Sequence, residues 1–190
     1  MKPCSLYERA NMFQVAFPKA PPLQYHEGML YGFWFLGGAR HSDFYGSYHV
    51  NYLDRIQSLF PDAEKVLHLF SGALPPSPKY TRFGMGEGEK PDIVGNAEQL
   101  SSILKFKPDL IFADPPYSIE DSMEHYKVGL VNRPRVIKEC AVVLQRGGFL
   151  VWLDQVLPVF DNKDLNLVGL IGYIRSTSNR FRCISIFRKP

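Results

Sequence analysis

Long apolar runs are missing from this sequence. The uninterrupted ones are short, such as Phe149 to Leu153, far below the roughly 20 residues that a membrane-spanning helix needs. Cysteine is scarce: Cys4, Cys140 and Cys183 are an odd number, lie far apart and form no CxxC pair. This pattern argues against a disulfide scaffold and a cysteine-rich zinc site, and it favours a reducing compartment. The amino terminus shows no apolar segment typical of a secretory signal, so a cytoplasmic protein is expected.

The chain has 190 residues, of which 45% are hydrophobic and 22% are charged, the balance of a globular protein with a buried core. No internal repeat, low-complexity tract or Gly/Ser linker divides it, so a single domain over residues 1–190 is expected. The net charge of +3 is small, but two basic segments, 127–150 and 175–190, lie in the carboxy-terminal half. They favour a phosphate-facing surface, although ordinary surface charge explains them equally well.

Strands alternating with turns and helices from Lys65 onward predict a mostly parallel α/β sheet. The expected elements are strands at 66–70, 80–83, 93–94, 110–113 and 149–153, and helices at 97–104 and from Asn132 to Gly147-Gly148. Strands 167–174 and 181–187 are joined by a link too short for a parallel crossover, which predicts an antiparallel hairpin. Before the sheet we expect a helix near 50–60. The proline- and aromatic-rich residues 1–35 are expected to form an irregular arm packed on the domain.

The residues most indicative of chemistry are Asp114-Pro115-Pro116-Tyr117, directly after the strand that ends at Ala113. In an open α/β sheet, ligands bind beyond the carboxyl ends of the strands, where this tetrapeptide lies. Two prolines remove two N–H donors, so neighbouring carbonyls point outward and are able to accept hydrogen bonds. Asp114 adds a carboxylate and Tyr117 a flat ring, an arrangement that suits a planar base with an exocyclic amine. An ordinary turn at a strand end is the alternative interpretation.

This tetrapeptide after an apolar strand resembles the catalytic motif of the amino-methyltransferases, which use S-adenosylmethionine to methylate an exocyclic nitrogen. Its D-P-P-Y form is the usual one in the adenine-N6 DNA methyltransferases. The resemblance covers roughly residues 40–190 and implies a Rossmann-like class I methyltransferase fold, with a seven-stranded, mostly parallel sheet and a C-terminal antiparallel hairpin. It implies a catalytic core over 61–190, with 1–60 as an arm and helix packed on it, and no separate target-recognition domain. The implied catalytic residues are Asp114, Pro115, Pro116 and Tyr117.

The same resemblance implies S-adenosylmethionine as cofactor. Residues 67–72 are similar to the cofactor-binding strand and glycine turn, 92–97 to the segment beside the adenine, and 44–48 to the segment at the methionine end. The implied cofactor-binding residues are Tyr45, Gly46, Ser47, Tyr48, Phe70, Ser71, Gly72, Asn96, Ala97 and Asp114. Only about seven residues separate Gly72 from Tyr80, fewer than the roughly ten of a helical crossover, so the first crossover helix is expected to be missing or reduced to a loop.

The implied partner is DNA, methylated at adenine N6 and held through its phosphates. The expected phosphate contacts are Arg133, Arg135, Arg180 and Arg182, from the two basic segments. RNA enzymes that act on adenine N6 or guanine N2 share the tetrapeptide, so an RNA methyltransferase stays open. The shortened cofactor turn leaves open a third possibility, a degenerate nucleic-acid-binding module. The five histidines show no helix-face ligand spacing, so no metal is expected, and no membrane partner is expected either.

Overall fold

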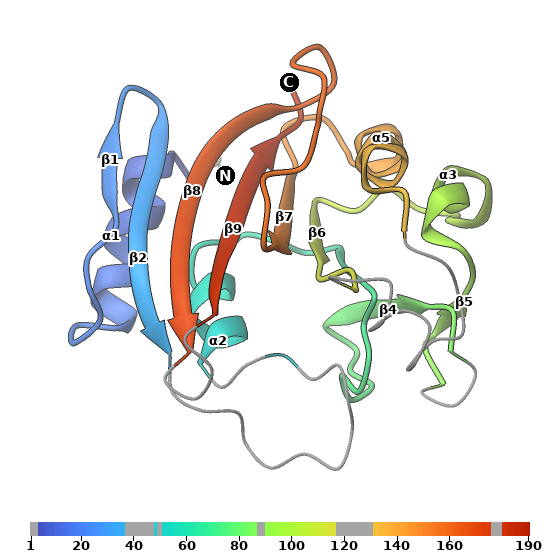
Figure 1. Ribbon diagram of the computed structural model, residues 1–190, viewed down its shortest axis with the longest axis horizontal. Coiled ribbons are helices and arrows are strands. Elements are labelled where there is room, and N and C mark those ends of the chain that lie inside the picture. The colour runs from blue at the N-terminus through green and yellow to red at the C-terminus, as the bar shows by residue number, and fades with distance from the viewer. Residues whose placement is uncertain (1–3, 37–47, 49–50, 87–89, 117–130, 176–179) are drawn as a thin grey trace.

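Nine strands of the described chain form one sheet (Figure 1). The computed structural model describes residues 4–36, 48, 51–86, 90–116, 131–175 and 180–190, with only the backbone of Arg175. The strand order across the sheet is β1-β2-β8-β9-β7-β6-β3-β4-β5. Along the chain the strands are β1 Gln24–His26, β2 Met29–Leu36, β3 Val66–Leu69, β4 Tyr80–Gly84, β5 Ile93–Val94, β6 Leu110–Ala113, β7 Phe149–Asp154, β8 Asn166–Arg175 and β9 Phe181–Arg188.

The seven strands from β3 to β9 have the arrangement expected from the sequence. Strands β5, β4, β3, β6 and β7 pair in parallel, whereas β9 lies antiparallel between β7 and β8. Every residue of β6 and β7 is buried, as continuous apolar runs in central parallel strands require. The prediction of a mostly parallel α/β sheet with a C-terminal antiparallel hairpin is therefore confirmed.

The amino-terminal residues differ from the irregular arm that we expected. Strand β2 pairs in parallel with β8 over seven register pairs, from Leu30–Gly169 to Leu36–Arg175, and β1 pairs antiparallel with β2. Helix α1, Leu6–Ala16, precedes them and begins with a capping box between Ser5 and Glu8. That box is a sequence signal for a helix start and was missed. The partner of β2 lies more than a hundred residues away, so its pairing had no local signal.

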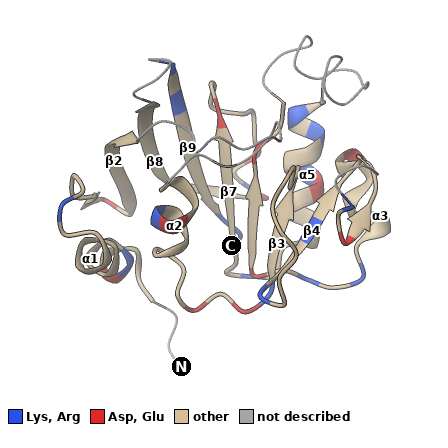
Figure 2. Cartoon of the chain, turned by 90° about the horizontal axis from the view of Figure 1, so that it is seen from below, with Lys and Arg blue, Asp and Glu red and all other residues tan. Residues whose placement is uncertain are grey.

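The helices form two layers on opposite faces of the sheet (Figure 2). Helix α1 and helix α2, Tyr52–Gln57, bury Phe13 and Ile56 against one face. The 3-10 turn η2, Ala97–Gln99, with α3, Leu100–Ile103, and α5, Arg133–Val143, bury Leu100 and Val136 against the other. The helices near 50–60 and at 97–104 are thus where the sequence predicted them.

The β3–β4 and β7–β8 connections contain no helix. Residues 70–79, between β3 and β4, are all described and form only turns and irregular backbone, so the prediction of a lost first crossover helix is confirmed. Residues 155–165, between β7 and β8, are also described throughout and form no helix. Strands β8, β9 and β2 therefore lack a described helix on the face covered elsewhere by α5 (Figures 1 and 2).

Helix α5 begins as predicted but ends earlier. The side chain of Asn132 accepts a hydrogen bond from the Arg135 amide and caps the first turn. The helix stops at Val143, and the glycine pair shapes the turn into β7 instead of capping the helix. Gly147 has φ +79°, and a Cβ on Gly148 would lie 2.8 Å from the Asp109 carbonyl, so neither position readily accepts a side chain.

Candidate functional site

The candidate site lies at the carboxyl ends of β3 and β6. The chain leaves β3 toward β4 and β5, then returns to β6 on the other side of β3 and continues to β7. This reversal makes the β3–β6 boundary a topological switch point, where open α/β sheets bind their ligands. Leu69 and Ala113 are register partners, so the turn after β3 and the motif after β6 begin side by side. The topology thus brings together two segments that the sequence singled out separately.

The turn after β3 has an unusual backbone. Phe70 has φ +57° and Gly72 has φ +49°, the left-handed region that bulky residues rarely adopt. Ser71 between them is 2% exposed, and its amide donates to the Phe83 carbonyl at 3.2 Å. This hydrogen bond anchors the turn to the end of β4. A tight turn with a glycine at this edge lets a ligand approach the main chain closely, so these residues fit a cofactor site.

The motif after β6 is placed as expected for three of its four residues. Pro115 is buried, and Asp114 and Pro116 are half-buried. The fourth, Tyr117, lies outside the described residues. Arg133 Nη2 donates to the Pro116 carbonyl at 3.1 Å. The hydrogen bond from Arg133 therefore holds this segment beside the switch point, with the Asp114 carboxylate at the end of β6.

The same arginine joins the motif to the end of the next strand. Arg133 Nε donates to Asp154 Oδ2 at 2.6 Å, with side chains 15% and 1% exposed. Asp154 ends β7, and its carboxylate also accepts from the Trp152 indole at 3.3 Å and from the Gln155 amide at 2.7 Å. The sequence analysis missed Asp154. The available signal was that an aspartate directly follows the apolar run Phe149 to Leu153. An acid at the end of a buried strand needs a hydrogen-bonding or charged partner.

A buried aromatic cluster lies beside the turn after β3. The hydroxyl of Tyr48 lies 3.1 Å from Nδ1 of His68, and the His68 ring stacks on Phe112 with centroids 4.9 Å apart. Burial lowers the pKa of His68 to about 3. Burial, and after it the negative charge of Asp114, raise the pKa of Tyr48. Tyr48 thus lies within the electrostatic influence of Asp114, whereas Tyr45, Gly46 and Ser47 lie outside the described residues.

The residues expected beside the cofactor adenine lie at the same edge of the sheet. Asn96 and Ala97 follow β5, and the Gly95 amide donates to the Gly84 carbonyl at the end of β4. Asn96 is exposed and caps η2, its Oδ1 accepting from the Glu98 amide at 2.9 Å. Ala97 is 4% exposed. The Asn96 oxygen therefore caps η2, and its contact with the adenine stays a prediction.

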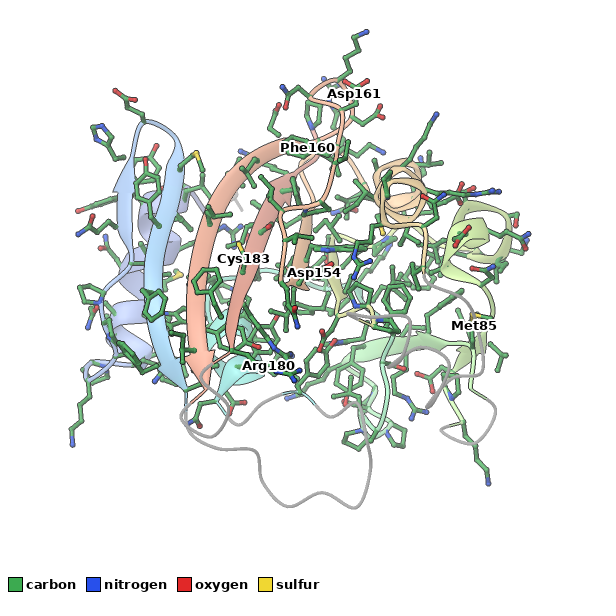
Figure 3. The ribbon with its side chains drawn as sticks, in the orientation of Figure 1. Met85, Asp154, Phe160, Asp161, Arg180 and Cys183 are labelled. Atoms are coloured by element: carbon green, nitrogen blue, oxygen red, sulfur yellow. The ribbon has the colours of Figure 1, made fainter. Side chains whose placement is uncertain are left out.

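The four arginines predicted to contact phosphates have different surroundings. Arg135 is exposed, and its Nε donates to the Glu98 carbonyl. Arg180 is exposed beside the start of β9 (Figure 3). Arg133 is engaged by Asp154 and Pro116. Arg182 is 9% exposed, and its charge opposes the rise in the pKa of Tyr52 that burial causes. Burial favours structural roles for Arg133 and Arg182, and exposure leaves Arg135 and Arg180 as candidates for phosphate contact.

Two further properties concern the described part of the chain. No group of three or more His, Cys, Asp or Glu side chains within it is placed to hold a metal ion. None of its helices combines the length and the apolar character needed to cross a bilayer.

No protein-family model matches the chain, and no curated protein matches it. Among solved structures, TrmN from Thermus thermophilus is 16% identical, with a TM-score of 0.47 over 67% of this chain and 44% of TrmN. The N-methyltransferase NodS from Bradyrhizobium japonicum WM9, in complex with S-adenosylhomocysteine (SAH), is 14% identical, with a TM-score of 0.45 over 67% of this chain and 79% of NodS.

A third solved structure matches most of the chain. SMU.776, a proposed methyltransferase complexed with SAH, is 12% identical, with a TM-score of 0.50 over 89% of this chain and 56% of SMU.776. The chain thus spans less than two thirds of TrmN and of SMU.776. At these identities the similarity concerns the fold, which is Rossmann-like and of the methyltransferase type.

Proposed function

We propose that this chain binds S-adenosylmethionine and transfers its methyl group to the N6 amine of adenine in DNA. The observation that carries the proposal is the position of Asp114. Its carboxylate follows β6 at the switch point, beside the left-handed turn of Phe70 and Gly72. We further propose that residues 1–190 act as one methyltransferase domain, because β1 and β2 extend the same sheet.

The proposed cofactor site is the edge formed by the turns after β3 and β5. Phe70, Ser71 and Gly72 would hold the cofactor along the main chain, with Asn96 and Ala97 toward its adenine. Tyr45 to Tyr48 would lie toward its methionine end. When bound, S-adenosylmethionine supplies an electrophilic methyl group on a sulfonium.

The proposed catalytic role of the motif is to prepare the amine for attack. An exocyclic amine on an aromatic ring is a poor nucleophile, because its lone pair is delocalised into the ring. Asp114 and the Pro115 carbonyl would accept its two hydrogens and hold its lone pair toward the methyl group. These contacts strengthen as positive charge develops on nitrogen, so they stabilise the transition state more than the ground state. Tyr117 would stack on the base, which leaves the duplex to reach the site.

The test is transfer of tritium from labelled S-adenosylmethionine to DNA and, in parallel, to RNA. Asp114→Ala should reduce turnover on DNA by about a hundredfold or more, with little change in cofactor affinity, because a preorganised electrostatic partner is lost. Glu64→Ala is the matched control, since Glu64 is an exposed acid before β3, at the opposite edge of the sheet. An Asp114→Ala variant as active as the parent would exclude the proposed mechanism. Transfer to RNA alone would change the substrate to RNA, at adenine N6 or guanine N2.

A second candidate is a nucleic-acid-binding module without catalysis. The observation that favours it is the segment 70–79, which has no helix whose N-terminus could face a ligand. Calorimetry with S-adenosylmethionine separates the two candidates. Heat of binding that disappears in Gly72→Val favours the methyltransferase, whereas DNA binding without any cofactor binding favours the module.

A further inference from the structure

Three phenylalanines lie on the face of β2, β8 and β9 that no described helix covers. Phe35 is 69% exposed and Phe181 is 52% exposed, and Phe33 between them is half-buried. We call these three residues the aromatic platform. Among the described residues no helix covers this face, because residues 155–165 cross from β7 to β8 without forming one. Large exposed rings on neighbouring strands are uncommon on a protein surface unless they bind something.

The rings of the aromatic platform pack against one another above Gly172. The Phe33 and Phe181 rings lie 6.1 Å apart with nearly parallel planes, and the Phe33 and Phe35 rings lie 5.1 Å apart edge to face. Gly172 of β8 lies beneath two of them. A Cβ at this position would be 2.8 Å from Phe33 and 2.9 Å from Phe181. The absence of a side chain at Gly172 therefore allows these rings to lie together.

The platform is continuous with the candidate site. Asp154, Cys183, Gly172 and Phe33 are successive register partners across β7, β9, β8 and β2, and Figure 3 shows Asp154 and Cys183 side by side. Three strand spacings separate Asp154 from Phe33, about 15 Å. About four or five stacked nucleotides of one strand span this distance.

Charge favours an anionic occupant. Arg180 is exposed and directly precedes Phe181. No acid follows Asp164 in the sequence, so no carboxylate side chain of the β8–β9 hairpin opposes Arg180, an exposed cation beside the aromatic platform. Aromatic rings beside a cation are the surface on which unpaired bases stack, with phosphates neutralised at the edge.

We propose that the aromatic platform binds unpaired bases of a nucleic-acid strand a few nucleotides from the target base. The identity of the target base rests on the proposed function. The binding of the strand rests on the aromatic platform alone. Base stacking tolerates any sequence, because every base has a π face. The platform would hold the strand while the target base occupies the site at Asp114.

The experiment measures binding of a fluorescent single-stranded 20-nucleotide DNA by anisotropy. Phe35→Ala and Phe181→Ala should each weaken binding by about tenfold or more, because each removes a stacking ring. Phe35→Trp should bind like the parent, and Phe35→Leu should bind like Phe35→Ala, since leucine is apolar but cannot stack. Tyr7→Ala is the matched control, because Tyr7 is an aromatic residue on α1, behind the opposite face, and is 58% exposed.

Three outcomes overturn the platform. The first is parent-like binding by a Phe35→Ala/Phe181→Ala double variant that unfolds at the parent's temperature. The second is Phe35→Leu binding as tightly as the parent. The third is a dimer by sedimentation that Phe35→Ala dissociates while DNA binding is unchanged, because a second copy would then cover this face. Tritium transfer on the same proteins separates the two proposals. If the variants lose strand binding and the parent protein methylates neither DNA nor RNA, the platform is supported and the proposed function is refuted.

Discussion

The ion pair between Arg133 and Asp154 is predicted to stabilise the fold and to hold the candidate site in place. Arg133 lies in the first turn of α5 and donates both to Asp154 and to the Pro116 carbonyl. Arg133→Met removes the charge and all donors but keeps an unbranched chain of similar reach. It leaves the Asp154 carboxylate, 1% exposed, without its cation. The variant should be destabilised and should also lose the tie on the motif.

The magnitude follows from the burial of the pair. Removing one partner of a buried ion pair costs about 3–5 kcal/mol. Two other donors, the Trp152 indole and the Gln155 amide, still solvate Asp154, so we expect the lower end of this range. For a chain of this size, 3 kcal/mol corresponds to a fall of about 6–12 °C in Tm. The change is a large part of a total stability of about 5–15 kcal/mol.

The assay is urea unfolding of a double-mutant cycle, followed by tryptophan fluorescence. Asp154→Asn removes the charge, and Arg133→Met/Asp154→Asn removes both charges. The loss of unfolding free energy in the double variant should be smaller than the sum of the two single losses, by about 1 kcal/mol or more. The reason is that each single variant leaves one buried charge without its partner, whereas the double variant contains neither charge. Methyl transfer should fall further in Arg133→Met than the folded fraction explains, with kcat affected more than KM. Additivity within about 0.5 kcal/mol, with Arg133→Met as stable as the parent, would refute the reasoning.

Three further predictions concern buried groups. Burial lowers the pKa of His68 from 6.5 to about 3, so below pH 6.5 only the unfolded chain gains this proton, and stability should fall by about 1.4 kcal/mol per pH unit toward pH 3. Urea unfolding between pH 4.5 and 7 should show this slope, and Tyr48→Phe/His68→Phe should remove its His68 part; an unchanged slope contradicts the assignment. Gly72→Ala should cost about 1–2 kcal/mol and weaken cofactor binding in calorimetry. Gly28→Ala, at φ +84° in an open turn, should cost a similar amount and leave binding unchanged; equal binding in both variants would place the site elsewhere. Burial raises the pKa of the Cys140 thiol, so mass spectrometry should find it unmodified by iodoacetamide until the chain unfolds, and rapid labelling of the folded protein would contradict its burial.

Patterns within a short stretch of sequence were enough to predict most of the core. Apolar runs and turn residues located β3 to β9, and the short spacing between Gly72 and Tyr80 predicted the missing crossover helix. Asn132 was correctly recognised as a helix cap. These features depend on neighbouring residues alone, because backbone hydrogen bonds in turns and helix caps close over a few positions. The capping box of α1 was equally local and could have been found.

Pairing between distant segments was decided only in the tertiary structure. The apolar and aromatic residues of β2 are compatible with a packed arm as well as with a strand. Only the pairing with β8 in the tertiary structure makes this segment a strand. Arg133 and Arg182 read as surface charge in the sequence, yet one binds Asp154, 21 positions away, and the other is 9% exposed. A charge run has no periodicity that distinguishes a solvent-facing side chain from a buried, paired one. The sequence therefore determined the strands and the position of the candidate motif, whereas the fold decided which charges and aromatic rings face solvent, because burial depends on contacts between residues far apart in the chain.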